Sequence, residues 1–155
     1  MLKDVIGRGP GRPTTAGAVA ATLALVVGGA LLVWSAYIHF HLWQTVGYKH
    51  IPTIGPLFIV QSIAGLVLGL TVVAVRRVWA AILGMGFALS TIGGFLLTVA
   101  LPKGLFNFKE SWSAPFAHQA FAIEVAATVV LIFAGALCLA GSASSTRAGL
   151  AGSPS

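Results

Sequence analysis

The chain has 155 residues, of which 57% are hydrophobic and only 8% are charged. Charged residues make up about a quarter of an ordinary globular domain, so this composition excludes a water-soluble protein and indicates a single domain surrounded mainly by lipid. The net charge of +6 comes from cations at the ends of apolar segments, which is typical of orientation signals in membrane proteins and argues against nucleic acid as a partner.

Residues 1–15 contain three cations among prolines and glycines, and we expect them to form a cytoplasmic basic tail. The uncharged segment that follows begins at residue 16 and continues through the aromatic sequence from Tyr37 to Trp43. It is much longer than the ~7–15-residue apolar core of a secretory signal. The segment therefore predicts a retained first membrane helix over residues 16–43.

Three further apolar segments follow, at residues 56–75, 78–101 and 115–141. Each reaches the ~20 residues needed to cross a bilayer as a helix, and a helix satisfies its own backbone hydrogen bonds in lipid. The fold class predicted is therefore all-α, a polytopic membrane protein with a bundle of four transmembrane helices. The small polar residues 142–155 are expected to be a disordered cytoplasmic tail.

The cations flanking the spans predict the orientation of the bundle in the membrane. With four spans, both termini lie on the same side as the short turn between the second and third spans. That side holds six cations, and the other holds three: Lys3, Arg8, Arg12, Arg76, Arg77 and Arg147 against Lys49, Lys103 and Lys109. We therefore expect cytoplasmic termini. All four histidines then lie toward the non-cytoplasmic side, where residues 50–56 and 104–115 should cover the mouth of the bundle.

Glu124 is the most informative single residue. It lies nine residues past Pro115, hence ~13 Å into the fourth helix, where an ionised side chain costs several kcal/mol. It must hold a proton, pair with another group or face a polar cavity. Gln61 lies at a comparable depth, as do Ser35, Ser62 and Thr98, so a polar layer inside the bundle is expected. We favour a proton- or ligand-binding carboxyl over one that only fixes helix packing.

The histidines complete the candidate site. His39 and His41 point about 200° apart on a continuous helix, so they could not share one metal ion. The favoured interpretation places both at the membrane interface beside the aromatic residues; the alternative turns one imidazole into the bundle. His118, one turn into the fourth helix, faces the same water layer, and imidazoles meeting there could bind a metal or a b-type haem.

The sequence contains no phosphate-binding glycine loop and no hydrolase or metalloprotease motif, so no catalytic residue is predicted. Small residues occur at helix-packing spacings, in Gly65-x-x-x-Gly69 and Ser90-x-x-x-Gly94. The leading hypothesis is a non-enzymatic accessory or scaffold component that contacts other membrane proteins, or its own copies, through glycine-rich helix faces. The alternative is a module that binds a proton, a quinone, a b-type haem or a metal, using Glu124, Gln61, His39, His41 or His118.

Two stretches carry a family resemblance, HLWQTVGYKHIPTIGPLFIVQ at residues 41–61 and LFNFKESWSAPFAHQAFAIEVAA at residues 105–127. With them, most of residues 16–140 resembles a group of small four-helix integral membrane proteins common in high-GC actinobacteria. The resemblance implies the four-helix architecture and a bacterial plasma membrane, and it implies no functional residues. A looser similarity to DoxX-type four-helix proteins concerns the fold alone.

Overall fold

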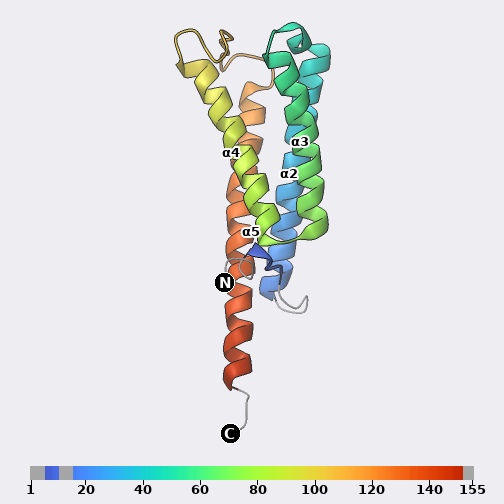
Figure 1. The fold of residues 1–155 in the computed structure, drawn as a ribbon, viewed down its shortest axis with the longest axis vertical. Coiled ribbons are helices and arrows are strands. Elements are labelled where there is room, and N and C mark those ends of the chain that lie inside the picture. Colours follow the sequence, from blue (N-terminus) through green and yellow to red (C-terminus); the bar gives the residue numbers. More distant parts are fainter. Residues whose placement is uncertain (1–5, 11–15, 152–155) are drawn as a thin grey trace.

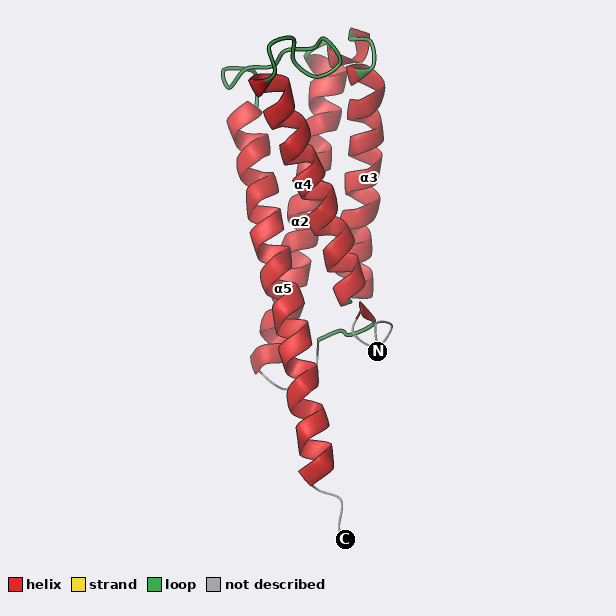
Figure 2. Cartoon of the chain, turned by 60° about the vertical axis from the view of Figure 1, so that its left-hand side comes forward, coloured by secondary structure: helices red, strands yellow, loops and turns green. Residues whose placement is uncertain are grey.

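The computed structural model describes residues 6–10 and 16–151 of the chain. Within these ranges, four long helices form the fold: α2 (Ala16–Thr45), α3 (Ile54–Val75), α4 (Val78–Ala100) and α5 (Ala117–Ala151). A short 3-10 helix, η1 (Tyr48–His50), connects α2 to α3. The long helices lie side by side in an elongated bundle, as Figures 1 and 2 show. The predicted all-α fold is confirmed.

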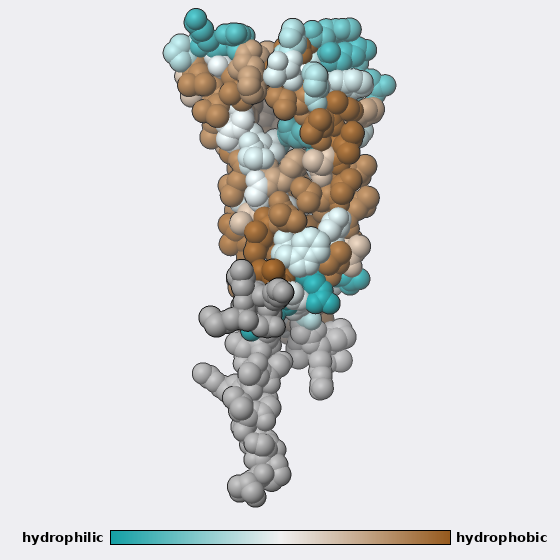
Figure 3. Space-filling model, in the orientation of Figure 1, coloured by the Kyte–Doolittle hydropathy of each residue, from teal (hydrophilic) through white to brown (hydrophobic). Residues whose placement is uncertain are grey.

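All four long helices are long and apolar enough to cross a membrane, and the apolar part of α5 ends at Ala140. Their outward faces carry large exposed apolar side chains, which form an apolar belt, and Figure 3 shows one face of it in brown. Lipid can solvate such a surface and water cannot. The chain is therefore a multi-pass membrane protein, and the predicted spans agree with the observed helices to within two residues everywhere except at the end of α5.

The C-terminal end of α5 differs from the prediction. The sequence indicated a last span ending at residue 141 and a disordered tail over residues 142–155, whereas α5 continues to Ala151; residues 152–155 lie outside the described part of the chain. The stretch from 142 to 151 contains no proline, and its alanines, Arg147 and Leu150 are good helix formers. Glycine and serine composition suggested a tail, but nothing in the stretch breaks a helix that enters it already formed.

The α2–α3 interface is the most extensive in the bundle, and two glycines allow it. A Cβ atom added at Gly29 would lie 2.6 Å from the carbonyl oxygen of Gly69, and one added at Gly69 would lie 2.7 Å from the carbonyl oxygen of Gly29. The two backbones therefore approach more closely than any side chain would permit. Gly69 belongs to the predicted small-residue motif Gly65-x-x-x-Gly69. The motif therefore mediates a helix contact inside the bundle.

α4 packs mainly on α5 and contacts α3 only sparsely, although a two-residue turn joins it to α3. Arg76 ends α3 in the left-handed conformation, with φ of 50°, and its N–H donates to the carbonyl of Val72. From this turn α4 leans away from α3, so that the two helices are far apart at their other ends (Figure 1). The two helices run antiparallel, but they diverge from the turn like the sides of a wedge.

The bundle has two distinct ends. We call the end formed by residues 46–53 and 101–116 the loop end, and the end that holds Arg76 and Arg77 the turn end. The main apolar core, which includes Leu25, Val72 and Leu131, fills the half nearer the turn end. There, residues of the N-terminal segment contact the start of α4: the carbonyl of Arg8 accepts from the N–H of Val78, and the Arg77 guanidinium donates to the carbonyl of Gly7. The half nearer the loop end is packed less completely.

Candidate functional site

α2 carries two polar residues on its buried face. Leu25, Leu32, Ser35, His39 and Leu42 recur at spacings of three, four and seven residues, so they form one stripe along the helix, and all five are buried. Ser35 and His39 therefore continue the apolar stripe of the core toward the loop end. The expectation that both His39 and His41 lie at the membrane interface is wrong for His39, whose exposed fraction is 7%.

Both ring nitrogens of His39 are engaged. Its Nδ1 lies 2.9 Å from the backbone carbonyl oxygen of Ser35, and since a carbonyl only accepts, Nδ1 donates this hydrogen bond. The side-chain amide nitrogen of Gln61, on α3, donates to His39 Nε2 over 3.0 Å. This is the hydrogen-bonding pattern of a neutral imidazole with its proton on Nδ1. Gln61 and the Ser35 carbonyl thus hold the ring in one orientation.

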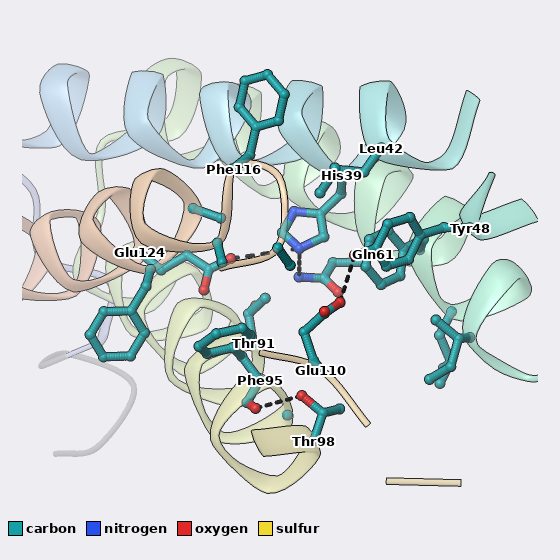
Figure 4. Close-up of a pocket in the computed structure, with 18 of the residues that line it drawn as sticks. His39, Leu42, Tyr48, Gln61, Thr91, Phe95, Thr98, Glu110, Phe116 and Glu124 are labelled. Carbon is teal, nitrogen blue, oxygen red and sulfur yellow. Dashed lines mark hydrogen bonds and ion pairs between the residues drawn. The ribbon is translucent and has the colours of Figure 1, made fainter. Parts of the chain in front are cut away.

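Glu124 reaches the same place from α5. Its exposed fraction is 3%, and its Oε1 accepts a hydrogen bond of 3.0 Å from the Ser35 hydroxyl. Oε1 also lies 3.9 Å from His39 Nε2. Its second oxygen, Oε2, makes no hydrogen bond to any described residue. In the described ranges, every fully buried polar side-chain atom has a hydrogen-bond partner. Since Oε2 has none, it is not fully buried and must border open space. Figure 4 shows His39 lying between Glu124 and Gln61.

That open space is a cavity of about 430 Å³ in the half of the bundle nearer the loop end. Its walls come from α2, α3, α4, the start of α5 and both segments of the loop end. Most of the lining is apolar, and the polar side chains among it are His39, Tyr48, Gln61, Ser90, Thr91, Thr98, Glu110 and Glu124. A mainly apolar cavity with a few converging polar groups has the size and the character of a small-molecule site.

The cavity reaches the outer surface of the bundle between α3 and α4. Leu57 and Val60 line it from α3, and their exposed fractions are 42% and 60%. Ser90, also exposed, lines it from α4. Figure 3 shows the apolar belt interrupted below the loops by a paler, hollowed strip. The opening therefore lies within the apolar belt of the bundle, flanked by exposed apolar side chains.

A hydrogen bond between the two loop-end segments closes the cavity at the loop end. The Tyr48 hydroxyl donates to Glu110 Oε2 over 2.6 Å, and the Tyr48 ring stacks on Phe58 with centroids 4.6 Å apart. Glu110 also accepts from the N–H of Ser111 through Oε1. Burial of the Tyr48 ring, together with the hydrogen bond and negative charge of Glu110, raises the pKa of the Tyr48 hydroxyl. Tyr48 therefore remains a donor throughout the physiological pH range.

Replacing Tyr48 with phenylalanine should loosen the loop end. The substitution removes a hydrogen bond to a charged acceptor, an interaction worth about 1.5–3 kcal/mol when buried and less in this half-buried setting. We expect faster hydrogen–deuterium exchange in residues 101–116 with little change in the helices. Tyr37→Phe is the matched control, because the Tyr37 ring lies on the outer surface with an exposed fraction of 57%. Equal exchange in the two variants would contradict the closing role of Tyr48.

His41 and His118 do not join this site. His41 stacks on Tyr37 and meets the edge of Phe116, and His118 is exposed and stacks on Trp112. The aromatic surroundings of His41 match the interface interpretation. Within the described residues, no three His, Cys, Asp or Glu side chains come close enough together to hold a metal ion. The structure thus assembles Glu124, His39 and Gln61, and leaves the other two candidates outside.

No family model, curated protein or solved structure matches this chain. Membership of the actinobacterial group therefore stays a prediction. The site has to be interpreted from its own chemistry.

Sequence reasoning missed several residues of the site. Thr91 and Phe95 of α4 line the cavity, and Tyr48 and Glu110 close it. Glu110 offered a signal, because it is one of only three acids in the chain and lies in a predicted covering loop. Thr91 and Phe95 offered none, since their exposure to a cavity depends on the tilt of α4.

Proposed function

We propose that this chain is a small-molecule-binding protein of a bacterial plasma membrane. The observation that carries the proposal is the convergence of Glu124, His39 and Gln61, from three different helices, on the wall of one cavity. Polar side chains inside a membrane are costly and occur mainly where they bind something. Here they are also oriented by hydrogen bonds before any ligand arrives, which lowers the cost of binding.

The ligand enters from the bilayer. The opening between α3 and α4 lies within the apolar belt, and the Tyr48–Glu110 hydrogen bond closes the side nearer water. A molecule that dissolves in lipid can reach such an opening without crossing water. The distribution of cations further supports a position of the loop end, and with it the site, in the non-cytoplasmic half of the membrane.

The accessory or scaffold function expected from the sequence has weaker support. It relied on glycine-rich helix faces, yet Gly28, Gly29, Gly65, Gly69 and Gly84 all lie against neighbouring helices of the same chain. Ser90 and Gly94 line the cavity. These small residues are therefore already used, whereas Gly86, Gly93 and Gly135 have open space around them and remain available to a partner.

The test is copurification of a ligand with the full-length protein, extracted from its native membrane and analysed by native mass spectrometry. Ala120 and Ala122 form a matched pair on α5, because Ala120 lines the cavity and Ala122 is exposed on the outside. We expect the wild type and Ala122→Trp to retain a small molecule, and Ala120→Trp to lose it. A wild type without a bound molecule, or an Ala120→Trp variant that retains one equally well, would overturn the proposal.

A further inference from the structure

The cavity has an unusual charge distribution. The described residues include two acids, Glu110 and Glu124, and both line the cavity. No lysine or arginine is among its lining residues, although the chain as a whole carries a net charge of +6. Apart from His39, whose hydrogen bonds are those of a neutral imidazole, the lining side chains can contribute only negative charge, opposite in sign to the net charge of the chain. Such a site repels anions and attracts cations.

Glu124 lacks a fixed counter-charge. The nearest group that could carry a positive charge is His39, 3.9 Å away, and its hydrogen bonds are those of a neutral imidazole. Glu124 Oε2 is free of hydrogen bonds to the described residues and faces the cavity. A buried carboxyl in this position has to hold a proton or face a positive charge. A cation in the cavity would supply that charge directly.

The remaining walls suit the same type of ligand. Seven aromatic rings line the cavity: Tyr48, Phe58, Phe87, Phe95, Phe108, Phe116 and Phe121. Aromatic faces attract ammonium-type cations, and the attraction strengthens where water is excluded. The hydroxyls of Ser90, Thr91 and Thr98 already donate to backbone carbonyls of α4, so toward a ligand they offer only acceptor oxygens. The site thus offers acceptors, carboxyls and ring faces.

We infer that the ligand is a lipid-soluble organic cation, such as a hydrophobic amine or a quaternary ammonium compound, whose charged group lies against Glu124. The inference rests on the proposed small-molecule function and specifies its ligand class. The apolar part of the ligand fits the apolar walls and the opening toward lipid. The cation compensates the carboxylate, which is costly in this position when it is alone.

The experiment compares three probes of similar size and different charge on the full-length protein in non-ionic micelles. These are tetraphenylphosphonium, neutral triphenylphosphine oxide and anionic tetraphenylborate, each measured by equilibrium dialysis against protein-free micelles. We expect the phosphonium to bind about tenfold more tightly than the oxide, and the borate not to exceed the micelle background. In Glu124→Gln, the phosphonium should lose about tenfold in affinity while the oxide is unaffected.

The outcomes separate the ligand class from the function itself. If the oxide binds as tightly as the phosphonium, and Ala120→Trp abolishes both, the cavity binds small molecules and the cation inference is wrong. Preferential binding of the borate would also refute it. If the wild type binds none of the probes above background, the cation inference fails, and ligand copurification decides the proposed function separately.

Discussion

Replacing Gly69 with alanine should destabilise the bundle. The new Cβ would lie 2.7 Å from both the carbonyl oxygen of Gly29 and Val33 Cγ2, and 3.1 Å from the backbone N of Val33. A flexible side chain could move away, but the backbone of α2 cannot do so without separating the two helices. Overpacking of this kind costs about 1–3 kcal/mol, so thermal unfolding in micelles, followed by tryptophan fluorescence, should occur at a clearly lower temperature.

The matched control is Gly86→Ala on α4, where nothing lies within 4 Å of the added Cβ. Alanine is the better helix former by up to about 1 kcal/mol, so this variant should unfold at the wild-type temperature or slightly above it. Gly69→Ala should also weaken ligand binding, because separating α2 from α3 lengthens the His39–Gln61 hydrogen bond. Equal unfolding temperatures for the two variants would contradict the close α2–α3 contact.

The helices could be predicted from sequence because the bilayer leaves few alternatives. Lipid demands internally hydrogen-bonded segments of a set length, and the uncharged segments of this chain have that length. The turn at Arg76 and Arg77 was equally clear, since two adjacent cations cannot lie in the apolar layer. The continuation of α5 beyond residue 141 could not be predicted, because no comparable constraint applies outside the membrane.

The rotation of each helix was harder to predict. A membrane helix is apolar all round, so hydrophobicity does not distinguish its inner face from its outer face. His39 nevertheless had a usable signal, because it follows Ser35 by four residues and Leu32 by seven, whereas His41 shares its face with Trp34 and Tyr37. A serine and a histidine on one stripe of the helix, opposite an aromatic stripe, indicate which face turns inward.

The cavity itself could not be predicted from sequence. It exists because α4 leans away from α3 toward the loop end, and that tilt follows from the packing of α4 on α5. The Tyr48–Glu110 hydrogen bond joins residues 62 positions apart in the two segments of the loop end. Neither periodicity nor spacing relates such residues, so only the folded chain shows that they meet.

Glu124→Gln should leave the fold intact, and Glu124→Ala should not. Glutamine keeps a carbonyl oxygen that can accept from the Ser35 hydroxyl, as Glu124 Oε1 does over 3.0 Å. Alanine removes this acceptor and leaves the Ser35 hydroxyl without its partner in the bundle interior, which costs about 1–3 kcal/mol. Thermal unfolding of both variants in the same micelles measures the difference. If Glu124→Gln unfolds as early as Glu124→Ala, the fold requires the negative charge, and His39 and Glu124 form an ion pair.

The same two variants decide between the two interpretations of Glu124 that the sequence left open. A carboxyl that only fixes helix packing can be replaced by an amide without consequence for ligands, because the hydrogen bond to Ser35 survives. A carboxyl that binds a cationic ligand cannot be replaced by an amide without loss of affinity, because the amide keeps the shape of the side chain and removes its charge. A folded Glu124→Gln protein that has lost its preference for tetraphenylphosphonium therefore assigns Glu124 to binding. A folded one that retains the preference assigns it to packing, and the cation must then be held by Glu110 and the aromatic walls.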